Sequence, residues 1–134
     1  FADTHTRGGL TDRQAPTDIE ERVTSYIESG SLFANATSAI KHFGDSMVEY
    51  PSGCVLFCRK VENPSLLVNG SPYVIETTEY RVTKKIHDKG EYIRAFSTND
   101  QKFPDGSLVY EPFDIPKTEI IRMHQILGYA YIHI

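Results

Sequence analysis

The sequence predicts an α+β domain in which two N-terminal amphipathic helices pack on one face of a mostly antiparallel sheet of about five to six strands. Three observations lead to this fold class. Apolar residues recur at helical spacing early in the chain, whereas apolar and polar side chains alternate between Tyr73 and Thr98. The last segment, Thr118 to Ile134, is rich in β-branched and aromatic residues, which favour strands.

Length and composition set the limits of the domain. A chain of 134 residues with 40% apolar side chains can bury one core, and a second domain would not fit. The formal net charge of −4 argues against a protein that works mainly on nucleic-acid backbone or anionic membrane, although it allows a local basic patch. No apolar run reaches about 18 residues, so we expect a soluble protein with no membrane partner.

The two cysteines, Cys54 and Cys58, lie four residues apart in an apolar run. In a strand their Cα atoms would be about 13 Å apart, too far for a disulfide between them. We therefore expect free or intermolecularly bonded thiols, buried as small apolar groups, and free thiols favour a reducing compartment. The chain has no zinc-type spacing and no phosphate-binding glycine loop, so no metal and no cofactor are predicted.

The N-terminal region divides into an arm and the start of the domain. Residues 1–15 are polar and aperiodic, which predicts a flexible arm, and residues 16–134 form the single domain. Thr17 and Glu20 have the spacing of a capping box, in which each side chain bonds a free backbone amide of the first helical turn. The apolar residues that follow lie on one face up to Gly30, so this segment is predicted to be a helix.

A second helix is expected from Ser31 to Met47, because its apolar residues keep the spacing of one helix face. The run CVLFCRKV then has the length and continuous apolarity of a buried central strand. Asn69-Gly70 predicts a tight hairpin turn, since both residues tolerate positive φ.

The stretch from Tyr73 to Thr98 is predicted to be a β-hairpin with its turn at residues 87–90. Side-chain parity sorts the hairpin and the last segment into two faces. The face predicted to lie under the helices holds Val74, Tyr80, Val82, Ile86, Ile93, Ala95, Ile121 and Met123. The opposite face gathers Glu79, Arg81, Tyr92, Arg94, Phe96, Arg122 and His124.

The chain after the hairpin is more ambiguous. Asn99 to Gly106 reads as a polar loop, and Ser107 to Glu111 as a short strand that Pro112 ends. For Thr118 to Ile134 a strand is favoured, while a helix over residues 118–128 remains an alternative.

The leading functional hypothesis is a small partner-binding domain without catalytic activity. Exposed rings beside arginines are typical of interface anchors, and Arg81, Tyr92, Phe96 and Arg122 are the predicted binding residues. We expect a protein partner, with RNA as an alternative. An exposed outer strand could also pair with a second copy, which would give a homodimer.

The same face offers a catalytic alternative. Glu79, Arg94 and His124 could act as general base, anion clamp and general acid in phosphodiester transfer from a ribose 2′-OH. The succession of helices and then a sheet bearing Glu, Arg and His resembles the microbial guanyl-type ribonucleases and the toxin domains built on that plan. The resemblance implies a metal-independent endoribonuclease. In the simpler interpretation, Glu79 and Arg94 are a cross-strand ion pair on a solvated face.

A second resemblance rests on the segment GSLVYEPFDIPKTEIIRMHQ. It is similar to the end of ADP-ribosyltransferase toxins, in which a glutamate orients the nicotinamide ribose. The resemblance implies that Glu111 is this glutamate and that Arg7 or Arg59 is the family's strand-end arginine. Thr37-Ser38 or Ser97-Thr98 would stand for its Ser-Thr-Ser strand.

Overall fold

The structure, a computed structural model, describes residues 5–7 and 35–131. The predicted helix of residues 16–30 lies outside this part of the chain, as does most of the predicted arm. The described elements are β1 (His5–Arg7), β2 (Ser38–Phe43), β3 (Val55–Lys60), η1 (Pro64–Leu66), β4 (Pro72–Thr77), β5 (Arg81–Asp88), β6 (Tyr92–Phe96), β7 (Phe113–Pro116), η2 (Lys117–Glu119) and β8 (Ile120–Ala130). None of the helices among these residues has the length and apolarity to span a membrane.

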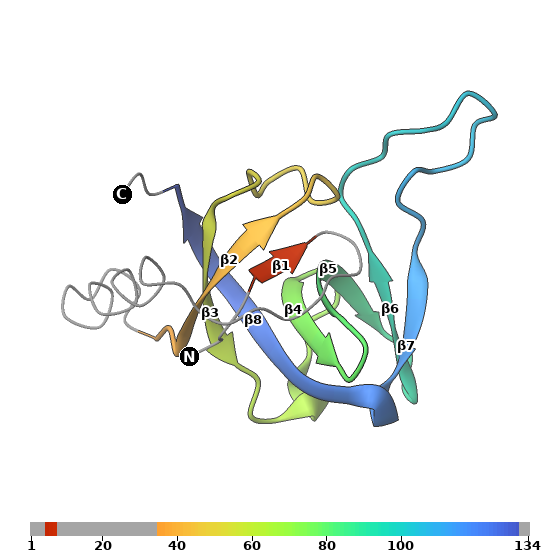
Figure 1. Cartoon of the computed structure of the whole chain (residues 1–134). Helices are drawn as coiled ribbons and strands as arrows, with labels where there is room; N and C mark the ends of the chain where they lie inside the picture. The colour runs from red at the N-terminus through yellow and green to blue at the C-terminus, as the bar shows by residue number, and fades with distance from the viewer. Residues whose placement is uncertain (1–4, 8–34, 132–134) are drawn as a thin grey trace.

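The strands form one strongly curved sheet in the order β1-β2-β3-β8-β4-β5-β6-β7 (Figure 1). All described pairs are antiparallel except those of β1, which runs parallel to both β2 and β5. Because β1 also pairs with β5, at Arg7 and Val82, the strands β1, β2, β3, β8, β4 and β5 close into a ring. The long strand β8 crosses the middle of the sheet between β3 and β4.

The main apolar core confirms most of the predicted parity of the central stretch. Val82, Ile86, Ile93 and Ala95 are fully buried together and pack with Met123 of β8. They belong to strands β4 to β8, which curl around them as a half-barrel (Figure 1). A second cluster lies on the opposite face, where Ile40, Leu56, Val74 and Ile126 meet. Val74 is therefore on the face opposite to the predicted one, and Ile121 is exposed.

The predicted fold class is wrong. The described part of the chain is a mostly antiparallel sheet without a long helix, and the second predicted helix, Ser31 to Met47, contains β2 instead. In β2, Ile40 packs on one face of the sheet and Ala39 on the other. Burial on both faces removes the polar-apolar alternation that identifies a strand, which is why the spacing resembled a helix face. The sheet also has more strands than the five or six expected.

Several local predictions are corrected as well. Leu66 to Val68 do not form a hairpin strand before Asn69-Gly70, because η1 occupies this loop and Asn69 Oδ1 accepts a hydrogen bond from Asp88 N. Ser107 to Glu111 is not a strand, and only Leu108 makes an isolated bridge. Residues 97–112 extend away from the sheet (Figure 1). The strand alternative for the last segment is confirmed by β8.

Both cysteines are free and buried, as expected. Burial raises the pKa of the Cys54 thiol to about 11 and that of Cys58 well above its ordinary range. Neither thiol is ionised at neutral pH, so both act as small apolar groups of the core.

The predicted turn between β5 and β6 is confirmed with a shift of about one residue. Gly90 has φ of +95°, and its amide donates to Asp88 Oδ1 at 2.9 Å. A Cβ there would meet no neighbour, so the cost of a side chain is conformational. We expect Gly90→Ala to lower the free energy of unfolding by about 1–2 kcal/mol. Urea unfolding would measure this, with the exposed Lys89→Ala as a control, and an unchanged midpoint for Gly90→Ala would contradict it.

Candidate functional site

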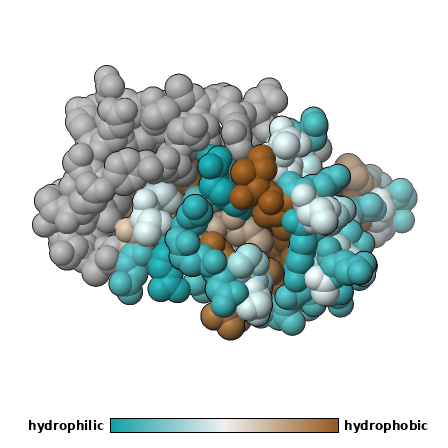
Figure 2. All heavy atoms as spheres, turned by 90° about the horizontal axis from the view of Figure 1, so that it is seen from below, coloured by the Kyte–Doolittle hydropathy of each residue, from teal (hydrophilic) through white to brown (hydrophobic). Residues whose placement is uncertain are grey.

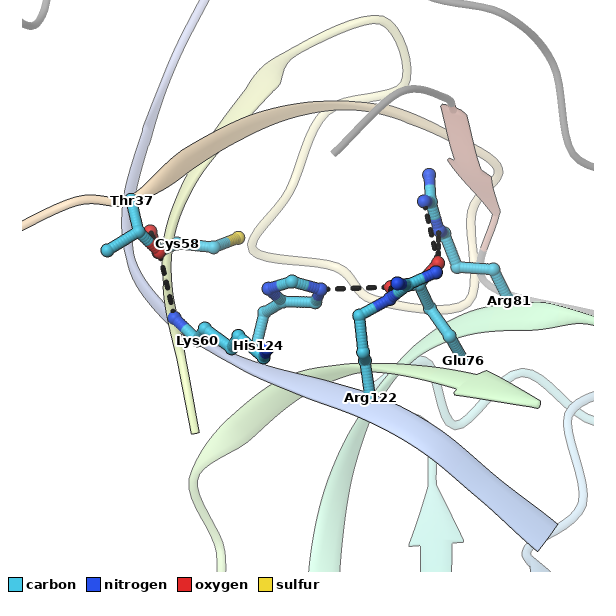
Figure 3. A network of polar contacts seen from close by, with 7 residues as sticks. All are labelled: Thr37, Cys58, Lys60, Glu76, Arg81, Arg122 and His124. Atoms are coloured by element: carbon cyan, nitrogen blue, oxygen red, sulfur yellow. Dashed lines mark hydrogen bonds and ion pairs between the residues drawn. The ribbon is translucent and has the colours of Figure 1, made fainter. Parts of the chain in front are cut away.

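A buried carboxylate, Glu76, lies at the centre of a polar network within the sheet. Glu76 of β4 is 1% exposed and lies opposite Arg81 on β5 and Arg122 on β8. Arg81 donates to Glu76 Oε1 through Nε at 3.3 Å and Nη2 at 2.9 Å. Arg122 Nε and His124 Nε2 approach Glu76 Oε2 at 3.0 and 2.9 Å (Figure 3). One carboxylate thus holds three cationic or potentially cationic groups from two neighbouring strands.

The protonation state of Glu76 follows from a balance of opposing effects. Burial alone would raise its pKa, because desolvation penalises the charged form. The hydrogen bonds from His124, Arg81 and Arg122, together with the charge of Arg81, outweigh burial and hold the pKa of Glu76 far below its ordinary range. Glu76 is therefore ionised at any ordinary pH, and it is a poor proton acceptor for catalysis.

The two ring nitrogens of His124 differ: Nε2 contacts Glu76, and Nδ1 has no hydrogen-bond partner among the described residues. Because Nε2 lies 2.9 Å from a carboxylate oxygen, Nε2 carries the hydrogen. Nδ1 is buried and has no hydrogen-bond partner in the described part of the chain. Figure 3 shows Cys58 on the other side of the ring. Burial raises the pKa of the Cys58 thiol, which disfavours the thiolate form that a cysteine nucleophile needs.

Arg122 connects this buried network to the surface. Its side chain is 42% exposed, and among the described residues only Glu76 engages it. The guanidinium is thus fixed at one end while its terminal nitrogens remain available. Arg122 borders a hollow of about 150 Å³ between η1 and the start of β8. Its other lining residues are Lys60, Val61, Pro64, Leu67, Lys117, Ile120, Ile121 and Met123.

A second, larger hollow of about 420 Å³ lies next to the first, and the two share Lys60 and Val61. Its other lining residues are Thr37, Arg59, Glu62, Asn63, Leu66, Tyr73 and Gln125. We call the two hollows together the cationic groove. Figure 2 views the molecule from the side of η1 and η2, and apolar side chains gather there among hydrophilic ones.

The charge of the groove differs in sign from that of the whole chain. Four cations line it, and Glu62 is its one acidic lining residue in the described part of the chain. Lys117 is paired with Asp88 at 2.8 Å, whereas Lys60 Nζ has no partner among the described residues. The whole chain has a net charge of −4, so the positive charge here is a local feature.

The groups of the predicted ribonuclease site do not come together. Glu79 is exposed in the turn between β4 and β5. Arg94 pairs with Asp114 at 2.9 Å on the β6–β7 edge, while His124 binds Glu76. Arg81 and Arg122, predicted as binding residues, do share a site, but their common partner is Glu76.

The predicted aromatic and arginine face is partly engaged within the chain. The Arg94 guanidinium lies 6.0 Å from the centre of the Tyr92 ring, and Phe96 contacts the His87 ring edge-on. Tyr92 and Phe96 are half-buried, and Arg94 is exposed. This face remains a prediction.

The residues of the transferase resemblance are dispersed over several elements. Glu111 is exposed in the long loop before β7, and Arg59 donates to Gln125 at 3.5 Å on the outer end of β3.

The candidates for the Ser-Thr-Ser strand are also apart from each other. Thr37 Oγ1 accepts from Lys60 N, and Ser38 is buried in β2. Ser97-Thr98 follows β6, and Arg7 belongs to β1.

Sequence reasoning missed Glu76, Lys60 and Lys117. Glu76 was assigned to neither predicted face, and the carboxylate chosen for the site was Glu79. The available signal was that Glu76 lies two residues after Val74 in the same predicted strand, so it shares a face with Val74. The contributions of Lys60 and Lys117 depend on how the end of β3 and η2 pack together, and the local sequence pattern does not specify this.

Within the described residues, no three His, Cys, Asp or Glu side chains come together as a metal site would need. Comparison with known proteins found no family that matches the chain and no curated protein that matches it.

Proposed function

We propose that the chain is a protein-binding domain whose cationic groove takes an extended acidic segment that also carries aliphatic side chains. The observation that supports this most is the combination of Lys60 and Arg122 with an aliphatic floor that includes Ile121, which is 47% exposed. An acidic partner would gain ion pairs at the rim, and its apolar residues would cover the floor.

The lining chemistry favours a peptide over single-stranded RNA. Proteins that bind single strands stack the bases on exposed aromatic rings. Tyr73, the aromatic residue that lines the groove, is 2% exposed, and its hydroxyl is used by Val68 N at 3.0 Å. Aliphatic side chains supply the remaining apolar surface, and they suit leucine or isoleucine better than a base.

The buried network supports the groove by fixing Arg122. A free arginine side chain loses rotamer freedom on binding, and this loss weakens affinity. Glu76 already holds Arg122 Nε at 3.0 Å in the folded protein. Part of the rotamer freedom of Arg122 is therefore lost on folding, and its loss does not weaken binding. Arg81 and His124 serve the same end indirectly, since they hold Glu76.

Binding can be tested with a short fluorescein-labelled peptide that alternates glutamate and leucine, followed by fluorescence anisotropy. We expect Lys60→Glu to weaken binding about tenfold, equivalent to about 1.4 kcal/mol. We expect Ile121→Ser to weaken it as well. Added salt should reduce the affinity for the wild type, because the rim pairs are exposed.

The matched controls are Lys102→Glu, an exposed lysine outside the groove, and Leu127→Ser, an exposed leucine of the same strand as Ile121. Both should bind like the wild type. An equal loss in Lys60→Glu and Lys102→Glu would show that only net charge matters. Tighter binding of oligouridylate than of the peptide would overturn the choice of partner.

A further inference from the structure

A second cluster of reactive groups lies at the base of the long loop that follows β6. Lys84 of β5 is 3% exposed, and its amine lies between two serine hydroxyls. Nζ is 2.6 Å from Ser97 Oγ and 3.1 Å from Ser46 Oγ. The Tyr110 ring lies 5.9 Å from the same nitrogen. None of these residues lines the cationic groove.

The two serines differ in access. Ser46 is fully buried, whereas Ser97 is partly exposed at the end of β6. Ser97 is therefore the more accessible of the two serines. The next residue is held firmly, because Thr98 Oγ1 accepts from Val48 N at 2.8 Å and donates to Glu49 at 2.6 Å. Ser97 is thus a fixed hydroxyl with a buried amine behind it.

Burial also changes the proton affinity of that amine. Desolvation lowers the pKa of Lys84 to about 8. A substantial fraction of the amine is then neutral in mildly alkaline solution, and a neutral amine can accept a proton from a neighbouring hydroxyl. Serine-lysine pairs are an established way to activate a serine nucleophile.

We propose that Ser97 and Lys84 form a nucleophile-base pair that accepts acyl groups from activated esters. The Ser97 Oγ–C bond forms on the ester carbonyl while Lys84 Nζ takes the hydroxyl proton. The bond from the carbonyl carbon to the leaving oxygen then breaks, and the leaving group takes the proton from Lys84. Water hydrolyses acyl-Ser97 by the same route, so the net reaction converts ester and water to acid and alcohol. Ser46 is a positioning residue that holds Nζ.

The test uses the full chain and a fluorophosphonate probe, which bonds covalently to activated serine hydroxyls with loss of fluoride. Peptide mass spectrometry should place the label on Ser97 of the wild-type protein. The labelling rate should rise as the pH increases toward and past the Lys84 pKa of about 8, because the neutral amine fraction grows. Hydrolysis of para-nitrophenyl acetate should fall at least tenfold in Ser97→Ala.

The control is Ser107→Ala, which removes an exposed serine in the same long loop. It should label and hydrolyse like the wild type. Absence of label on wild-type Ser97, or a label spread over several exposed hydroxyls, overturns the proposal without the need for a folded variant. Unchanged ester hydrolysis in a folded Ser97→Ala protein overturns it as well.

Discussion

We expect Glu76→Gln to lower the free energy of unfolding by about 3–5 kcal/mol, the usual cost of removing one partner of a buried ion pair. The substitution keeps the shape of the side chain and removes its charge. Arg81, which is 1% exposed, would then lose the charge of the Glu76 carboxylate at 2.9 Å, and Arg122 would lose its anchor. Urea denaturation followed by circular dichroism would measure the change.

The matched control is Asp114→Asn, which removes the carboxylate from the exposed ion pair with Arg94. The side chains of that pair are 46% and 45% exposed, so water replaces much of the lost interaction. The expected cost is about 0–1 kcal/mol. Equal effects of the two substitutions would mean that the Glu76 network contributes no more than a surface pair.

The same comparison tests the link between the network and the groove. If Glu76 fixes Arg122 for binding, Glu76→Gln should weaken the acidic peptide under conditions in which the variant is still folded. Asp114→Asn should leave the peptide affinity unchanged, since neither Asp114 nor Arg94 lines either hollow.

Much of the central sheet could be predicted from the sequence, because one of its faces packs against a core of its own. Val82, Ile86, Ile93 and Ala95 alternate with polar residues, and the structure buries all four together. The period of two is a direct result of strand geometry and needs no knowledge of the partner strand. The absence of a disulfide between Cys54 and Cys58 could be predicted as well. The rise per residue of a strand places Cα atoms four residues apart beyond the reach of a disulfide.

The strand β2 and the Glu76 site could not be predicted, because they depend on pairing between strands that are far apart in the sequence. β2 has buried residues on both faces, so its strand period is hidden and its spacing fits a helix equally well. The site depended on register: Glu76 meets Arg122 only because β8 returns to pair with β4. No local pattern specifies which residue of a strand lies opposite which, and for that reason Glu79 was chosen instead of Glu76.

Acid should destabilise the protein through two groups, and the first to respond as the pH falls is His42. This residue of β2 is fully buried, and its pKa is lowered to about 4. Burial is the main cause, the charge of Lys84 adds to it, and Asp45 opposes it. An unfolded histidine has a pKa of about 6.5. Between these two values the unfolded chain binds a proton that the folded chain does not.

The sign of the effect follows from this difference. Stability rises with pH wherever the unfolded state binds more protons, so the contribution of His42 is complete above about pH 6.5 and is lost as the pH falls toward about 4. The expected loss is on the order of 3 kcal/mol. The depressed pKa of Glu76 acts in the same direction at lower pH, below about 5, where an unfolded glutamate begins to bind its proton.

The free energy of unfolding, measured by urea denaturation at several pH values, separates the two groups. His42→Gln should flatten the slope between about pH 6.5 and 4, because glutamine binds no proton in this range. His87→Gln is the control, since this imidazole is exposed. If the slope persists in His42→Gln, the acid sensitivity arises elsewhere. If Glu76→Gln flattens the upper range instead, the carboxylate and not the imidazole takes up the proton there.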